Sequence, residues 1–126
     1  MDQKFFICEH CGNLVGMIED SGVPLVCCGE DMKELVANTV EASQEKHLPV
    51  VNPINGGIEV TVGSVAHPME TGHHIAWVYV KTNQGGQRKA LKEEPKASFA
   101  LTKDEKAEEV YAYCNLHGLW KTELLK

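Results

Sequence analysis

An alternation of apolar and polar residues marks the clearest strand of the chain, at residues 58–62 (IEVTV). A period of two places the three apolar side chains on one face, which is typical of a half-buried β-strand. Residues 75–81 are rich in β-branched and aromatic side chains, and residues 98–101 and 110–114 indicate further short strands. Strands at this spacing predict an antiparallel sandwich.

Turn signals separate these strands. Residues 55–57 (NGG) form a hairpin turn signal, and residues 83–86 (NQGG) turn the chain again. One helix signal competes with them, because residues 102–105 (TKDE) match a capping box ahead of residues 106–110. We expect a helical turn there at most. Residues 37–46 are polar and predict a connector.

Residues 1–36 predict a small hairpin module. A strand-like stretch at residues 14–19 is followed by a turn signal at residues 20–22 (DSG) and a returning stretch at residues 23–26. So short a segment cannot bury enough apolar surface to fold unaided, and a bound metal is the usual remedy. We therefore expect an all-β chain in two domains, a metal-stapled module and an antiparallel sandwich over residues 37–126.

Size and composition agree with this division. A chain of 126 residues suits one ordinary domain or a small module plus a domain of about ninety residues. The net charge of −6 disfavours a nucleic-acid partner, because phosphate binding needs a concentrated basic surface. With no apolar run long enough to span a bilayer and no signal-peptide stretch, we expect a cytoplasmic protein without a membrane partner. Thiols stay reduced there, so cysteine clusters indicate metal sites.

The first candidate metal site has four thiols. Cys8 and Cys11 are separated by two residues, and the adjacent pair Cys27 and Cys28 follows across the predicted hairpin. A glycine follows each pair, where the backbone must bend sharply around a metal. A disulfide between neighbours is strained, because a trans peptide fixes their Cα atoms about 3.8 Å apart. Zinc and iron both accept four thiolates, so a purely structural zinc knuckle remains an alternative.

The second candidate site combines histidines with the remaining cysteine. Cys114 and His117 lie three residues apart where a strand ends, and the inward strand face should carry the thiol. His67 and His73 flank a short loop, and His47 lies in an extended segment. Four imidazoles and one thiolate are too many for a closed tetrahedral zinc site. Five ligands leave one octahedral position open, which suits iron chemistry on a small molecule.

Two further histidines are not expected to be ligands, and two other functions also use such motifs. His10 sits inside the first cysteine turn and is expected to be solvated, and His74 should face the other side of its strand from His73. A blue-copper carrier would want a methionine shortly after His117, and none follows. A zinc-stapled interaction module with incidental histidines is the other alternative. Metal content separates these functions.

Taken together, the motifs resemble the desulfoferrodoxin family of two-iron superoxide reductases. The resemblance rests on the early CxxC and CC pairs, residues 45–49 (EKHLP), residues 67–69 (HPM) with His73, and residues 114–118 (CNLHG). These motifs occur in the family's order and cover nearly the whole chain. The resemblance implies a desulforedoxin-like module with a four-thiolate iron, followed by an immunoglobulin-like sandwich with a catalytic iron.

The resemblance also implies the role of each site residue. The first iron is bound by Cys8, Cys11, Cys27 and Cys28. The second is surrounded in a plane by His47, His67, His73 and His117, with Cys114 axial. Glu45 and Lys46 match loop residues beside the open position, where Lys46 would attract the anion and orient a proton-donating water, and Glu45 would take the sixth position of the oxidised iron.

The implied reaction is the one-electron reduction of superoxide, with two protons, to hydrogen peroxide, in defence against oxidative stress. Dismutation is the alternative chemistry at such a metal. A rubredoxin-like electron donor and a homodimer that pairs through the small module are the implied partners. Whether the first iron relays electrons or only staples the module stays open. The chain departs from the family at residues 72–74 (GHH), which predicts a looser loop beside the site.

Overall fold

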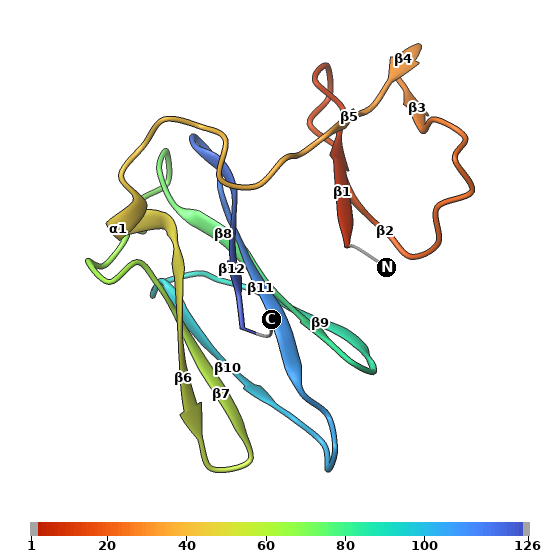
Figure 1. Ribbon diagram of the computed structural model, residues 1–126. Coiled ribbons are helices and arrows are strands. Elements are labelled where there is room, and N and C mark those ends of the chain that lie inside the picture. Colours follow the sequence, from red (N-terminus) through yellow and green to blue (C-terminus); the bar gives the residue numbers. More distant parts are fainter. Residues whose placement is uncertain (1–2, 125–126) are drawn as a thin grey trace. The chain divides into compact units, whose positions relative to one another are not determined.

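The computed structural model describes residues 3–124 and confirms an all-β chain with one short helix (Figure 1). The described residues divide into two compact units, with the boundary between Val36 and Ala37. Each unit has its own sheets. Among the described residues, no helix is long and apolar enough to cross a bilayer.

Five short strands make up the described part of the first unit: β1 (Lys4–Ile7), β2 (Leu14–Met17), β3 (Val26–Cys27), β4 (Glu30–Asp31) and β5 (Lys33–Glu34). One sheet has the order β2-β1-β5, and β3 and β4 form a separate hairpin. Only Phe5 and Cys8 are buried apolar side chains of the described part of this unit. The strand predicted at residues 14–19 ends early, at Met17. The strand predicted at residues 23–26 begins only at Val26.

The second unit is a sandwich of two antiparallel sheets (Figure 1). The three-stranded sheet has the order β10-β7-β6 and the four-stranded sheet the order β12-β11-β8-β9. Sheets of three and four strands are also what an immunoglobulin constant-type sandwich has. The strands are β6 (Pro49–Ile54), β7 (Gly57–Val62), β8 (Ile75–Thr82), β9 (Gly85–Ala90), β10 (Lys96–Ala100), β11 (Ala107–Cys114) and β12 (Gly118–Glu123).

The core of the sandwich lies between the two sheets. Strand β7 alternates buried and half-buried positions along its whole length, so Val60 and Val62 are fully buried as the sequence period predicted. Val78 and Val110 meet them from the other sheet, within one continuous apolar cluster. Burying each such side chain contributes about 1.5–3 kcal/mol. Cys114 belongs to the same cluster and ends β11 at the margin of the core.

The sequence missed several elements of this unit. Strands β6, β9 and β12 lack a clear alternation. Helix α1 (Gln44–His47) occupies the end of the segment predicted as a connector and includes His47, for which an extended conformation was wrongly predicted. The capping-box signal at residues 102–105 leads to a turn and not to a helix. Glu105 does accept the backbone N–H of Thr102 at 3.1 Å, as in a capping box. Asp104, however, has a φ of 68°, which no helix accommodates.

Candidate metal centres

A tight hairpin positions Cys114 and His117. Strands β11 and β12 pair up to Cys114 and Gly118, which leaves a loop of residues 115–117 between them. Gly118 has a φ of 78°, the left-handed conformation with which three-residue hairpin loops usually close. The Nε1 of Trp120 donates a hydrogen bond to the carbonyl of His117 at 3.1 Å. The loop therefore holds one thiol and one imidazole at the same end of the sheet.

A second loop carries His67 and His73. The backbone N–H of His67 donates to the carbonyl of Val62 at 3.3 Å, which folds the chain back at the end of β7. Farther on, Glu70 and His73 exchange two backbone hydrogen bonds of 2.9 and 3.2 Å, which close a turn over residues 71–72. The segment for which the sequence predicted a looser loop is thus held by hydrogen bonds.

Helix α1 carries His47 together with Glu45 and Lys46. The Nδ1 of His47 donates to the carbonyl of Ser43 at 2.6 Å, and the ring is buried. The carbonyl of Glu45 accepts the N–H of Val65 at 3.0 Å, which fixes the helix to the neighbouring loop. The side chains of Glu45 and Lys46 are exposed beside this buried ring. The sequence pattern did not predict this helix, although all three residues were predicted to belong to the site.

The four histidines form a closed ring of imidazoles. Following the order His47, His67, His73, His117 and back to His47, successive ring centroids lie 4.7, 4.7, 5.2 and 4.9 Å apart. Each ring meets the next edge to face, at angles from 71° to 89°. The Sγ of Cys114 lies 3.8 Å from the Nδ1 of His117. The five ligand atoms all lie within 4.8 Å of one another.

The positions of the N–H hydrogens in the group of four imidazoles make nitrogen lone pairs face one another. The Nδ1 atoms of His47 and His67 both donate to backbone carbonyls, so in the neutral rings both Nε2 atoms carry lone pairs. These two Nε2 atoms lie 3.2 Å apart, and the Nδ1 of His117 lies 3.1 Å from the Nε2 of His47. The Nε2 of His73 is buried without a hydrogen-bond partner among the described residues. Such an arrangement is stabilised by a cation between the nitrogens, and the residues fit a metal.

Burial keeps two of the imidazoles, those of His47 and His67, in the form that binds metals. It lowers the pKa of His67 to about 4, against the hydrogen bond to Pro68 that acts in the opposite direction. Burial also lowers the pKa of His47 below its ordinary value. Both side chains are only 2% exposed. They are therefore neutral at physiological pH, and neutral imidazole is the form that binds metals.

The four cysteines of the first unit also gather at one point. The sulfur atoms of Cys8, Cys11, Cys27 and Cys28 lie within 4.8 Å of one another, with Cys11 and Cys27 at 3.6 Å. The glycines after the two pairs have φ angles of 84° and 78°, which confirms the sharp bends that the sequence predicted. Cys28 has a φ of 53°, a conformation that costs energy in a residue with a side chain.

The close approach of these thiols gives them different pKa values. The backbone N–H of Cys11 lies 3.5 Å from the Sγ of Cys8 and is the main reason that the pKa of Cys8 falls to about 6. Hydrogen bonds with the side chains of Cys11 and Cys8 raise the pKa of Cys28 to about 12. Four thiolates at this spacing repel one another, and a cation of charge two or three removes that repulsion. The group therefore fits a four-thiolate metal.

Two histidines stand apart from both groups, as the sequence predicted. His10 is exposed and pairs with Glu30 at 3.0 Å. The Nδ1 of His74 bonds to the carbonyl of Glu70 at 2.9 Å. Neither residue belongs to the two ligand groups found among the described residues.

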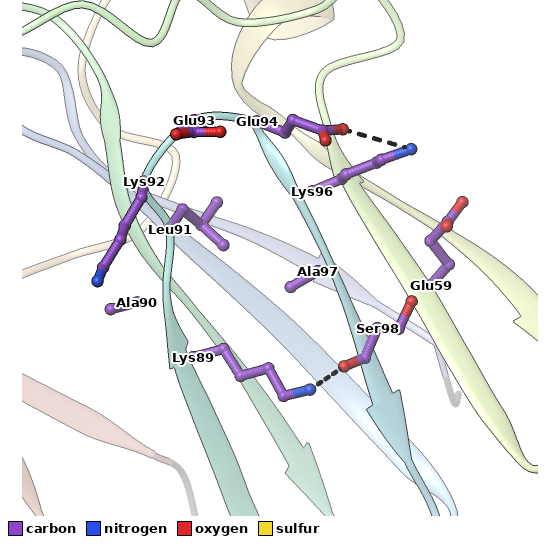
Figure 2. Close-up of a pocket in the computed structure, with 10 residues that line it drawn as sticks. All are labelled: Glu59, Lys89, Ala90, Leu91, Lys92, Glu93, Glu94, Lys96, Ala97 and Ser98. Atoms are coloured by element: carbon purple, nitrogen blue, oxygen red, sulfur yellow. Dashed lines mark hydrogen bonds and ion pairs between the residues drawn. The ribbon is translucent and has the colours of Figure 1, made fainter.

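A pocket between the edge strands β9 and β10 shares no residue with either ligand group. Figure 2 shows Lys89 of β9 reaching the carbonyl of Ser98 on β10, and Lys96 paired with Glu94 at 3.5 Å. Its lining mixes both signs of charge and contains no cysteine or histidine. Lys89 thus bridges the two sheets at an edge where β9 and β10 do not pair with each other, so the pocket is a structural feature of the sandwich.

Comparisons with known proteins agree with both groups. The family model described as desulfoferrodoxin matches residues 39–123, and the one described as the desulfoferrodoxin N-terminal domain matches residues 2–35. Desulfoferrodoxin from Syntrophotalea carbinolica is 48% identical over 122 residues, and that from Nitratidesulfovibrio vulgaris 44% over 124; each alignment covers 95% of both chains. The crystal structure of the superoxide reductase from Treponema pallidum superimposes with a TM-score of 0.83 at 41% identity, covering 98% of this chain and 100% of that one.

Proposed function

The chain belongs to the desulfoferrodoxin family, and on that premise we propose which residues hold its metals and act on its substrate. It is a superoxide reductase with two iron centres, which converts superoxide, one electron and two protons into hydrogen peroxide. We assign residues 1–36 to a four-cysteine iron module and residues 37–126 to the catalytic domain. The division of the chain after Val36 supports this assignment.

The catalytic iron is held by the closed ring of His47, His67, His73 and His117 together with Cys114. This ring is the observation that carries the function, because its lone pairs converge and its fifth donor is a buried thiol. When bound, iron supplies a reversible one-electron couple, and five protein ligands leave it one open position for a small molecule. A closed structural zinc site binds four ligands, one fewer than are gathered here.

The first iron is held by Cys8, Cys11, Cys27 and Cys28, and its physical role is to stabilise the first unit. The described part of that unit buries only two apolar side chains, Phe5 and Cys8. A core of this size does not offset the conformational entropy of folding, and a structural metal does. An electron relay is not needed to explain this centre.

Lys46 provides the local positive charge that an acidic protein otherwise lacks. The chain has a net charge of −6, so its overall field does not attract superoxide. Lys46 is exposed on α1, next to the buried ligand His47, and its charge is one of the causes that lower the pKa of that ring. Its ammonium attracts the anion and orients a water that donates protons, while the exposed Glu45 beside it is the second proposed active-site residue.

The partners proposed are a rubredoxin-like electron donor and a second copy of the chain, in the cytoplasm. Dimerisation is supported by exposed apolar side chains in the first unit, where Ile18 is 93%, Val23 69% and Val26 64% exposed. Strand β2 is also an edge strand, whose free backbone groups can pair with another chain. Light scattering on the iron-loaded protein, compared with an Ile18→Asp variant, tests the dimer.

Metal content combined with visible spectra tests the function. Two irons per chain, with an iron–thiolate absorption of the oxidised catalytic centre that Cys114→Ser abolishes, are expected. Copper, or zinc alone, would instead establish a blue-copper carrier or an interaction module. Peroxide and dioxygen yields then decide the chemistry. A reductase forms peroxide without dioxygen and needs an external reductant, whereas a dismutase forms both and needs none.

A further inference from the structure

Asn115 joins the two loops that carry His73 and His117. Its Oδ1 accepts the backbone N–H of His74 at 2.8 Å, and its Nδ2 donates to the carbonyl of Gly72 at 3.0 Å. The side-chain amide therefore grips the peptide units on both sides of His73. Asn115 itself lies between Cys114 and His117 in the hairpin loop.

These hydrogen bonds act beside His73, whose imidazole has fewer hydrogen bonds to the backbone than those of His47 and His67. The rings of His47 and His67 are each anchored by an Nδ1–H bond to a backbone carbonyl within four residues. No such bond to the ring of His73 is found among the described residues, and its Nε2 has no hydrogen-bond partner there. The His73–His117 pair also has the longest centroid separation of the four, 5.2 Å. The backbone on either side of His73 must then fix its place.

We propose that Asn115 is a positioning residue of the catalytic centre, whose side-chain amide holds the backbone around His73 against the turn that bears Cys114 and His117. The inference rests on the proposed ligand set. Asn115 is not among the proposed ligands; it acts through the backbone around His73 and sets the distance between two donors. One backbone bond, from the N–H of Asn115 to the carbonyl of His74 at 3.2 Å, does not depend on the side chain and keeps the loops in contact when the amide is removed.

The chain offers a matched control for this clamp. Asn83 donates through Nδ2 to the carbonyl of Asp104 at 3.0 Å and accepts the N–H of Lys106 through Oδ1 at 2.8 Å. It thus ties two turns with the same pair of hydrogen bonds as Asn115. One turn joins β8 to β9 and the other leads into β11, whose far end carries Cys114. Asn83→Ala therefore removes an equal clamp from the same domain without touching a ligand-bearing loop.

The test uses the full chain loaded with both irons, as wild type, Asn115→Ala, Asn115→Asp and Asn83→Ala. Iron loss to an excess of chelator is followed separately for the two centres by their visible absorption, so the four-cysteine centre is an internal reference. We expect Asn115→Ala to lose the catalytic iron about tenfold faster, the usual scale for removing an outer partner of a metal ligand. Asn115→Asp, which keeps the acceptor for His74, should lose it more slowly than Asn115→Ala.

A change in stability alone gives a different pattern. It would lower the melting temperature of Asn83→Ala and Asn115→Ala alike, and would not favour loss from one centre. Equal rates of catalytic iron loss in these two variants would overturn the positioning role. If Asn115→Ala does not fold, the comparison of Asn115→Asp with wild type decides in the same way. A wild type without iron in the catalytic centre would refute the proposed ligand set instead, so the two failures are distinct.

Discussion

The indole of Trp120 stacks on the imidazole of His47, with ring centroids 4.9 Å apart and planes 23° from parallel. The same indole donates its N–H to the carbonyl of His117. Trp120 is only 1% exposed, so it belongs to the interior of the sandwich. One interior side chain thus supports two of the four imidazoles, and packing of the core is coupled to the arrangement of the ligands.

Replacing Trp120 should therefore affect both stability and iron. Trp120→Phe keeps an aromatic ring against His47 but leaves the carbonyl of His117 without this donor, and a hydrogen bond of this kind contributes about 0.5–1.5 kcal/mol. Trp120→Ala also leaves a cavity, with a cost of about 3–5 kcal/mol. Urea unfolding measures the free energy, and iron loss from the catalytic centre should accelerate in the same order. Trp77→Phe, whose ring stacks on Tyr113 instead, should leave iron loss unchanged.

Gly63 provides the space that helix α1 needs. It has a φ of 86°, and an added Cβ would lie 2.3 Å from the carbonyl oxygen of Val65 and 2.7 and 2.8 Å from those of Lys46 and Glu45. These are backbone atoms that cannot rotate away. Gly63→Ala should therefore displace α1, lower the free energy of unfolding by more than about 1 kcal/mol and weaken retention of the catalytic iron.

Gly56 separates the two causes of this effect. It has a similar φ of 80°, but an added Cβ there would meet no atom within 4 Å. Gly56→Ala should carry the conformational cost alone, about 1 kcal/mol, and leave iron retention and superoxide reduction unchanged. Equal iron retention in Gly63→Ala and Gly56→Ala would mean that close packing at Gly63 does not position the helix.

The sequence predicted the parts of the fold and site that have a local signature. Residues 58–62 alternate strictly because one face of β7 lies in the core, and the NGG signal turns the chain between β6 and β7. The nine proposed metal ligands could be selected by residue type and spacing, because few other roles need paired cysteines and a late Cys-x-x-His. The structure gathers them into two groups.

The remaining features depend on contacts between distant residues. Strands β9 and β12 pair with stronger neighbours, β8 and β11, so their own periodicity is weak. Helix α1 has only four residues and lacks a side-chain cap; it is held by the hydrogen bond from Val65. Asn115 and Trp120 are not metal-ligand residue types, so nothing in the sequence predicts their role. Their effect on the site comes from partners that only the folded chain brings near.

Glu105 should make the stability of the second unit depend on acid. Its carboxylate accepts hydrogen bonds from the hydroxyl of Thr82 at 2.7 Å and from the N–H of Thr102 at 3.1 Å, and these bonds lower its pKa from the ordinary 4.5. A lowered folded-state pKa means that the carboxylate stabilises the fold above the unfolded pKa, and that this contribution is lost as pH falls through the folded pKa.

Glu105→Gln tests this dependence. The variant should have a lower urea midpoint than wild type near neutral pH, and the difference should shrink as the pH falls below the ordinary pKa of the carboxyl, 4.5. Midpoints for both proteins at a series of pH values measure it. A difference that stays constant over the whole series would show that the charge of Glu105 does not matter to folding.

Cys11→Ser should remove the first iron and leave the catalytic one. Cys11 is an exposed member of the four-cysteine group, and the two groups lie in different compact units. Loss of one thiolate should unfold the first unit, whose small core depends on the metal. Superoxide reduction with an artificial reductant should persist at a rate within about twofold of wild type, as the catalytic ligands are intact. Loss of all turnover while the second iron remains bound would instead establish an obligatory relay.

Lys46→Ala should slow the reaction with superoxide by about tenfold at low salt, because a local positive charge raises the encounter rate of an anion. The dependence of the rate on ionic strength should weaken at the same time, since the removed charge is the one that salt screens. Pulse radiolysis measures both. Lys103→Ala is the matched control: Lys103 is exposed in the turn before β11, whose opposite end carries Cys114. Equal rates and equal salt dependence in the two variants would remove Lys46 from the mechanism.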